Sequence, residues 1–360
     1  MNRLQKAVPT SSHKPPDLGE PKWTLASPQL IWPPSVDIWC GYVAGGWSPY
    51  DLDGGMDESL EALVLWASTL GGLGCRVRVY HNSGGPARHL IHRGVHFLPH
   101  NRFEADGQRQ VLVTWGAVHP WRMGAAARLK LHWSLGREPP WHPRLAGCVD
   151  RFVFSSVAHR QACPWVEDSK ALVAPWGVDL GLLDLCWRPK RENRALYAGP
   201  MDTGLEQVLT LWSQVYQHRK GLELEVICPK PDYHRPGYGR LSRLLAQPGV
   251  MLRDRVSRME VAEGCWKARY RLFGVVDRDG WRWGGGSAAR AKSAYCGAVP
   301  VAAGEPPGGE ETPSRSGDPL WRACPDFALG ADGPAPLTPE PVMDWLSVVQ
   351  RVWEPLFKGE

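Results

Sequence analysis

The apolar positions of the chain alternate between short continuous runs and stretches with helical spacing. The run VDIWCGYV at 36–43 predicts a buried strand, and CRVRVYHN at 75–82 predicts another. Between them, after glycine-containing loops, apolar residues recur three and four positions apart, as on one helix face: Leu60, Leu63, Val64, Ala67 and Leu70. A strand, glycine loop, helix and strand in this order form a βαβ unit, the start of a doubly wound parallel sheet.

The same pattern restarts in the second half. After further predicted strands at 110–115, 128–133 and 151–156, the polar segment 185–193 divides the chain. A strand is then expected at 194–199, followed by a helix whose apolar face runs from Leu205 to Val215. The later elements are a strand at 222–229, a helix opened by the capping box of Ser257 and Glu260, and a strand at 270–276.

These patterns predict an α/β protein in which two Rossmann-like domains face a cleft. We divide the chain into an extended arm at 1–35, a first domain at 36–185 and a second domain at 190–335. An amphipathic helix within 338–360 is expected to cross back to the first domain. The arm is either disordered or attached to the body through Trp23 and Trp32.

Composition narrows the class of protein. A net charge of +5 spread along 360 residues permits an anionic ligand but does not indicate DNA binding. The nine cysteines form no Cys-x-x-Cys pair, which argues against a zinc site and a disulfide framework. Without a signal pattern or an apolar run near the roughly 20 residues of a membrane span, we expect a cytoplasmic protein with no membrane span and no bound metal.

The stretch WRWGGGSAARAKSAYCGAVPV at 281–301 predicts a glycine loop, a short helix that ends at Gly297 and a strand. Free N–H groups at the start of such a helix are suited to bind phosphate, and Arg290 and Lys292 add positive charge. The two cations do not share a helix face, so we expect one of them to face the ligand. We favour Arg290, because a guanidinium binds phosphate in a bidentate manner.

Seven segments in chain order resemble the retaining, nucleotide-sugar-dependent glycosyltransferases of family 4, which have the GT-B architecture of two Rossmann-like domains. The segments are GGMDESLEALVLWASTLGGLGCRVRVY, LKLHW, VDRFVFSSVAHRQA, LVAPWGVDLGLL, RALYAGPMDTGLEQVLTLWSQV, GVMLRDRVSRMEVAEGCWKA and SAYCGAVPV. The resemblance implies a metal-independent transfer of a hexosyl or pentosyl group, with retention, from a nucleotide-sugar. This donor is a substrate, and no cofactor is implied. The resemblance does not identify the acceptor, which is a glycan, a protein or a modified nucleic acid.

The chain departs from the family where chemistry is expected. Pro200 and Thr203 occupy the places of the Arg and Lys that neutralise the donor diphosphate. Gly284 and Lys292 occupy the places of the two Glu residues, and a Lys cannot accept hydrogen bonds from ribose hydroxyls as the second Glu does. The acid is either absent or displaced, and Asp279 is the candidate for a displaced acid.

The resemblance assigns residues to two roles, each with a structural alternative. The catalytic candidates are His132, which is alternatively a core histidine, and Asp279. The donor-binding candidates are Gly54, Gly55, Gly199, Thr203, Gly285, Gly286, Ser287, Arg290 and Lys292. Of these, Gly54 and Gly55 alternatively form a tight turn. We predict that His132 and the 54–55 loop face residues 284–287 across the cleft, whereas Asp179 is assigned to a turn.

Three functions follow from these observations. The first is a glycosyltransferase that uses a nucleotide-sugar. The second is a catalytically impaired GT-B protein that binds or regulates, which the losses at Thr203, Gly284 and Lys292 favour. The third is a glycosyltransferase acting on modified DNA bases.

Overall fold

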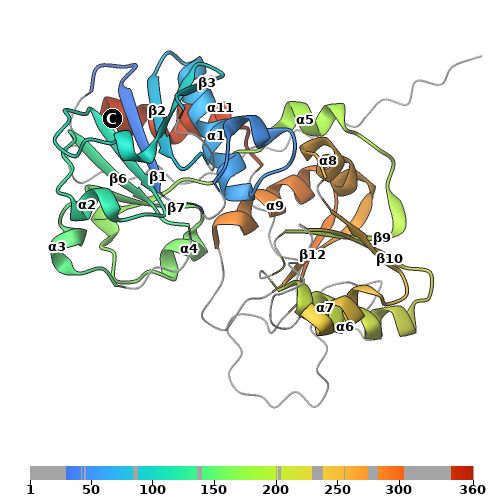
Figure 1. Ribbon diagram of the computed structural model, residues 1–360. Helices are drawn as coiled ribbons and strands as arrows, with labels where there is room; N and C mark the ends of the chain where they lie inside the picture. Colours follow the sequence, from blue (N-terminus) through green and yellow to red (C-terminus); the bar gives the residue numbers. More distant parts are fainter. Residues whose placement is uncertain are drawn as a thin grey trace, which may run out of the picture.

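The computed structural model describes residues 30–41, 43, 46–83, 88–135, 140–199, 201, 204–228, 238–254, 256–274, 283–303 and 342–359. Figure 1 shows two α/β domains side by side, each built on its own sheet, with the chain passing from the first to the second near α5. The α/β fold with two Rossmann-like domains, expected from the sequence, is confirmed.

The first domain contains an eight-stranded sheet in the order β3-β4-β2-β1-β5-β6-β7-β8. Strands β3 and β4 pair antiparallel and all other neighbours are parallel. The strands are β1 (Ser35–Gly41), β2 (Arg76–His81), β3 (Leu90–His92), β4 (Val95–Pro99), β5 (Val111–Trp115), β6 (Leu129–Trp133), β7 (Arg151–Phe154) and β8 (Ala171–Val173). The helical segments are η1 (Pro49–Leu52), α1 (Glu58–Gly72), η2 (His100–Arg102), α2 (His119–Arg122), α3 (Pro143–Ala146), α4 (Val157–Gln161) and η3 (Asp168–Lys170).

The second domain contains a five-stranded parallel sheet in the order β11-β10-β9-β12-β13. Its strands are β9 (Arg191–Ala198), β10 (Glu223–Ile227), β11 (Val250–Arg253), β12 (Ala268–Gly274) and β13 (Val299–Ala303). Its helices are α5 (Leu180–Leu185), α6 (Leu205–His218), α7 (Tyr238–Leu245), α8 (Arg258–Lys267) and α9 (Trp283–Tyr295). Figure 1 shows α8 on one face of this sheet and α6 and α7 on the other.

The structure differs from the sequence prediction in a few elements. Strands β3, β4, β8 and β11, the short helices α2 to α5 and helix α7 were not predicted. Helix α9 begins at Trp283, so Gly284–Gly286 form its first turn rather than a loop before it. The predicted phosphate-binding loop is therefore already helical.

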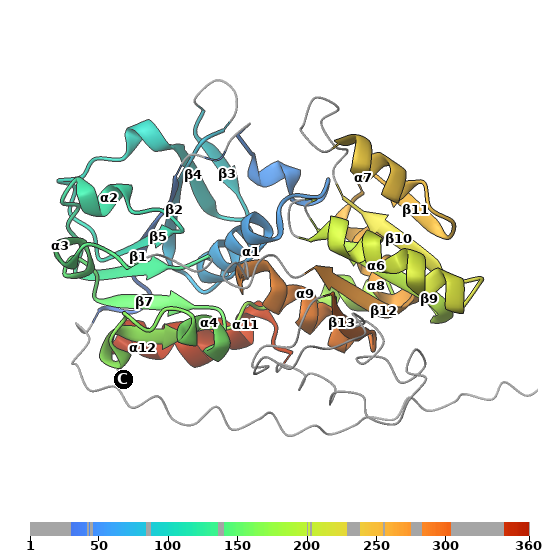
Figure 2. The ribbon, with the colours of Figure 1, turned by 90° about the horizontal axis from the view of Figure 1, so that it is seen from below.

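A cluster of tryptophans joins the last helical segment to the core of the first domain. This segment is continuous through α11 (Trp345–Val348), the π-helical η4 (Val349–Trp353) and α12 (Glu354–Lys358). Trp353 is fully buried, with its ring centroid 4.8 Å from that of Trp66 and 4.9 Å from that of Trp133. Figure 2 shows α11 and α12 lying along the first domain, as the predicted return crossing requires.

The N-terminal arm meets the same helix where the structure describes it. The backbone N–H of Leu30 donates to the carbonyl of Phe357 at 3.2 Å, and Trp32 stacks on Phe357 at 6.2 Å. The proposed contact through Trp32 is therefore present, whereas Trp23 lies outside the described residues.

The two described chain crossings between the domains lie next to each other. Val178 donates its backbone N–H to the carbonyl of Met343 at 2.9 Å and forms a parallel bridge with Asp344. Gly177 is required here because a Cβ at this position would lie 2.7 Å from the backbone and ring of Trp345. The outgoing and returning segments are thus hydrogen-bonded to each other.

We predict that Trp353→Ala lowers the free energy of unfolding by about 3–5 kcal/mol, because it removes a fully buried ring and leaves a cavity. Urea unfolding measures the change. The control is Trp187→Ala, whose side chain is 59% exposed and whose loss should change stability little. Equal stability of the Trp353 variant and the parent would contradict the assignment of the last helix to the first core.

Candidate functional site

A cavity of about 820 Å³ lies between the two domains. The first domain contributes residues of the segment 46–61, which includes the start of α1. The second domain contributes α8, α9 and the ends of β9 and β10, where Gly199 and Cys228 follow the strands directly. Doubly wound sheets bind ligands at this carboxyl edge, and the volume is typical of small-molecule sites.

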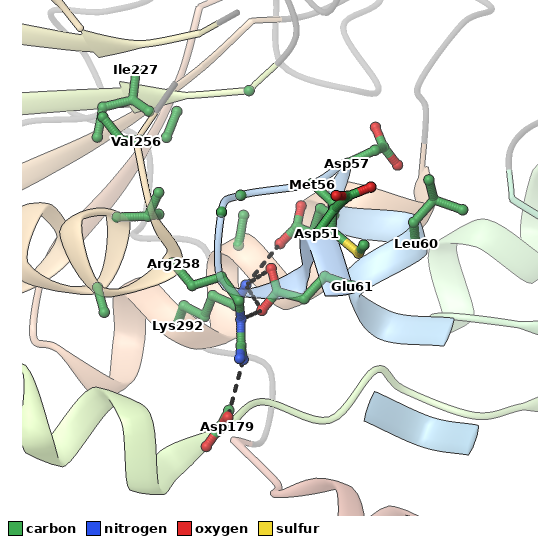
Figure 3. A pocket seen from close by; sticks show the side chains of 18 of the residues that line it. Asp51, Met56, Asp57, Leu60, Glu61, Asp179, Ile227, Val256, Arg258 and Lys292 are labelled. Carbon is green, nitrogen blue, oxygen red and sulfur yellow. Dashed lines mark hydrogen bonds and ion pairs between the residues drawn. The ribbon is translucent and has the colours of Figure 1, made fainter. Parts of the chain in front are cut away.

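The N-terminal turn of α1 directs carboxylates toward the second domain. Asp57 caps the helix by accepting the backbone N–H of Ser59 at 2.9 Å. Glu58 and Glu61 then lie three positions apart, which places them on the same side of the helix. Both line the cavity, and Figure 3 shows Glu61 pointing toward Arg258 and Lys292.

Arg258 reaches across the domain boundary from the first turn of α8. A cation at a helix N-terminus is repelled by the positive end of the helix dipole, so Arg258 needs nearby carboxylates to stabilise its charge. Its Nε donates to Glu61 Oε1 at 3.1 Å and its Nη2 donates to Asp179 Oδ2 at 3.0 Å, with the side chain only 6% exposed. Asp179 also caps α5 through the N–H of Leu182, so the predicted turn residue has a second role.

Lys292 of α9 completes the ion pairs. Its Nζ lies 3.2 Å from both carboxylate oxygens of Glu61 and 3.8 Å from Glu58 Oε1. Burial alone would raise the pKa of Glu61, but Lys292 and Arg258 outweigh burial and hold this pKa below its ordinary value. Burial lowers the pKa of Lys292, yet Glu61 and Glu58 hold it above its ordinary value. Both partners are thus charged at neutral pH.

For Glu58, in contrast to Glu61, the effect of burial on the pKa exceeds that of the nearby cations. Burial raises the pKa of its carboxyl to about 7, and the attraction of Lys292 offsets only part of this effect. The cavity therefore contains a carboxyl group that gains or loses its proton near neutral pH.

The predicted glycines of the first domain form part of the domain contact. Gly55 has φ +86°, and a Cβ at this position would lie 2.3 Å from the carbonyl oxygen of Val256. Nearby, the backbone N–H of Arg258 donates to the carbonyl of Asp53 at 3.4 Å. The 54–55 loop thus both lines the cavity and contacts the second domain, and its predicted role in donor binding stays a prediction.

The cavity brings together four of the predicted donor-binding residues: Gly54, Gly55, Gly199 and Lys292. The favoured Arg290 is not among the described residues that line it, and Lys292 is. Helical geometry explains this difference in position, because a residue two positions away lies on a different side of α9. Gly285, Gly286 and Ser287 lie in the N-terminal part of α9, and their predicted role in binding phosphate stays a prediction. Thr203 and Asp279 lie outside the described residues.

The prediction that His132 faces the cleft is wrong. His132 is fully buried in β6, and its Nδ1 forms a 2.8 Å hydrogen bond with the hydroxyl of Thr114. Its ring packs against Trp141 at 4.4 Å and Phe152 at 5.9 Å. Successive strand residues point to opposite faces, so a residue near a strand end can face the core instead of the ligand edge.

Sequence reasoning missed Glu58, Glu61, Arg258 and Arg271 as site residues. One local signal was available for Arg258, because an Arg directly after the N-cap is unfavourable unless a carboxylate approaches from elsewhere. Arg271 lies within an apolar strand pattern, where its own cost of burial was the available signal.

Neither a metal-binding cluster nor a membrane-spanning helix occurs among the described residues. Among the described residues, no group of three or more His, Cys, Asp or Glu is arranged to hold a metal ion. In the part of the chain that the structure describes, no helix combines the length and apolar character needed to cross a membrane.

We predict that Glu58→Gln stabilises the protein at pH 8 by about 1–2 kcal/mol. The folded-state pKa of about 7 lies above the ordinary 4.5, so ionisation of Glu58 opposes folding as pH rises. The difference between variant and parent should disappear below about pH 4.5 and be complete above about pH 7. Urea unfolding across this range, with the exposed Glu167→Gln as control, measures it; a less stable Gln variant at pH 8 would contradict the prediction.

We predict that Arg258→Ala lowers the free energy of unfolding by about 2–4 kcal/mol, because Glu61 and Asp179 each lose a buried partner. Arg188→Ala is the matched control: Arg188 pairs with Glu263, but its side chain is 42% exposed, so its loss should cost at most about 1 kcal/mol. Calorimetric and urea unfolding compare the variants. Similar losses for the two would show that the buried pairs do not hold the domains together.

Comparison with solved structures shows that the fold is shared with glycosyltransferases. AviGT4, a glycosyltransferase involved in avilamycin A biosynthesis, is 17% identical, with 75% of this chain and 78% of that chain covered and a TM-score of 0.52. Sucrose-phosphate synthase from Thermosynechococcus elongatus is 11% identical, with 74% of this chain and 81% of that chain covered and a TM-score of 0.54. A glycosyltransferase from Rickettsia africae is 9% identical, with 75% of this chain and 79% of that chain covered and a TM-score of 0.52.

Sequence comparisons give no such match. No protein-family model and no curated protein matches the chain. The chain therefore has the two-domain GT-B fold of glycosyltransferases at a level of identity that shows the fold alone.

Proposed function

We propose that this protein transfers a sugar from a nucleotide-sugar to an acceptor in the cavity between its domains. The observation that carries the proposal is the position of this cavity at the carboxyl edge of the second sheet, in a fold shared with glycosyltransferases. Gly199 and Cys228 end two strands there, and Arg258, Arg271 and Lys292 bring positive charge to the same wall.

The proposed reaction follows the resemblance to the retaining enzymes of family 4. The bond between the sugar C1 and the diphosphate oxygen breaks, and the nucleoside diphosphate leaves with the electron pair. An acceptor hydroxyl oxygen bonds to C1 from the same face and transfers its proton to the departing phosphate oxygen. Cationic side chains stabilise the departing charge, so the proposal includes no metal and no further cofactor.

The acceptor belongs on the first-domain side of the cavity. Asp51, Asp57 and Glu58 line this side, together with Trp47 and Tyr50. Carboxylates accept hydrogen bonds from hydroxyl groups and aromatic rings cover apolar sugar faces, so a glycan or another hydroxyl-bearing acceptor fits this chemistry. We place the reaction in the cytoplasm.

A second function is favoured by the ion pairs of Lys292. In the resembled family, a carboxylate at this position binds the donor ribose, whereas here the position carries a cation paired with Glu61 and Glu58. A protein that binds a nucleotide and does not turn it over is consistent with this replacement.

A panel of UDP-, GDP-, ADP- and dTDP-sugars tests both functions. We expect at least one of them to stabilise the protein by about 2.7 kcal/mol at 100 times its dissociation constant, and to release nucleoside diphosphate when an acceptor is present. Retention is read from the anomeric configuration of the product by NMR. Stabilisation without release or transfer would favour the second function, and no binding to any member of the panel would refute both.

A pair of glycine variants tests whether this cavity is the binding site. Gly54→Trp adds an indole to its wall, where the nearest neighbour of a new Cβ is a backbone oxygen 3.6 Å away. We expect it to weaken donor binding at least tenfold. Gly72→Trp is the control: a new Cβ there meets nothing within 4 Å and Gly72 does not line the cavity. Equal donor affinity in both variants would place the site elsewhere.

A further inference from the structure

Arg271 lines the second-domain side of the cavity and is only 4% exposed. It projects from β12 toward α8 and the end of β9. Its Nη2 donates to the carbonyl of Ala198 at 2.7 Å, and its Nη1 lies 3.6 Å from the sulfur of Cys265. The guanidinium also lies over the ring of Phe273, 5.8 Å from its centroid, so a backbone oxygen, a thiol and an aromatic face hold it in place, and none of them carries a negative charge.

The positive charge of Arg271 is unmatched. It forms no ion pair with a carboxylate of the described residues, and its Nε has no hydrogen-bond acceptor. Three other buried arginines have carboxylate partners: Arg109 pairs with Asp37, Arg194 with Glu225 and Arg258 with Glu61. An unpaired buried charge is costly, so a site that retains one is suited to a ligand that brings the opposite charge.

The neighbours of Arg271 indicate which anion fits. Lys292 and Gly199 line the same cavity, so a second cation is nearby and no side chain stands at the end of β9. Glu58 is close enough for Arg271 to lower its pKa, although burial dominates that group and leaves it partly protonated at neutral pH. A diphosphate brings several charged oxygens to the unpaired guanidinium of Arg271, which binds phosphate oxygens in pairs, while Lys292 stays paired with Glu61.

We propose that Arg271 binds the diphosphate of the nucleotide-sugar donor and replaces the cations that are absent at Pro200 and Thr203. The inference rests on the proposed function for the identity of the donor. It differs from the sequence-based prediction, which assigned this role to Arg290. The role of Arg271 is to bind and orient the diphosphate and to stabilise its charge as it departs.

The test is calorimetric titration of the full-length protein with inorganic pyrophosphate, which needs no knowledge of the base, and then with UDP, GDP and ADP. We expect Arg271→Gln to weaken binding of pyrophosphate and of the preferred nucleotide at least tenfold. Arg269→Gln is the matched control, since Arg269 lies on the same strand, pairs with Glu192 and does not line the cavity. Its affinity should stay within twofold of the parent.

Arg271→Lys keeps the charge and loses the paired N–H groups, so we expect an intermediate affinity. This variant decides the question if the Gln variant does not fold. Parent-like affinity of a folded Arg271 variant, or no diphosphate binding by the parent, would overturn the inference. Pyrophosphate binding that depends on Arg271, in a protein that neither binds nor turns over nucleotide-sugars, would refute the proposed function and the identity of the donor, and would keep only the assignment of Arg271 as a diphosphate-binding residue.

Discussion

The arrangement of the two domains depends on one buried carboxylate, that of Glu61. It lies between Arg258 and Lys292, which come from two different helices of the other domain. Removing charges from water is costly, and this cost is recovered only when partners are held at close range and further hydrogen bonds are made. The N-terminal turn of α1 must therefore stay close to Arg258 at the start of α8 and to Lys292 in α9. The cavity lies beside these ion pairs, between the two domains (Figure 3).

Much of the fold was predictable because its signals are local. The apolar faces of α1 and α6 recur at helical spacing, and β1, β2 and β9 are apolar runs that end at glycines or polar residues. The missed strands gave weak signals: β11 is largely exposed and β3 spans three residues. The site was less predictable, because Glu61 and Arg258 are 197 positions apart and no sequence spacing connects them. His132 shows the reverse error, in which the position near a strand end was right and the direction of the side chain was not.

The departures from the resembled family are connected to one another by charge. Where the family has a carboxylate, this chain has Lys292, and Glu58 and Glu61 of the opposite domain supply the compensating negative charges. Where the family has loop cations, this chain has Pro200 and Thr203, while the second-domain wall retains Arg271 within a strand. The signs of the charges around the cavity have been redistributed among different elements. A motif search confined to the usual positions would interpret this redistribution as loss.

The hydrogen bond between Val178 and Met343 has a mechanical consequence. The chain leaves the first domain and returns to it through two segments that are joined side by side. The surroundings of one segment are therefore also the surroundings of the other. Because a Cβ at Gly177 would collide with Trp345, a larger residue in the outgoing segment would displace the returning one. The returning segment leads into the helix that places Trp353 in the first core, so a change at the domain boundary would reach the packing of the first domain.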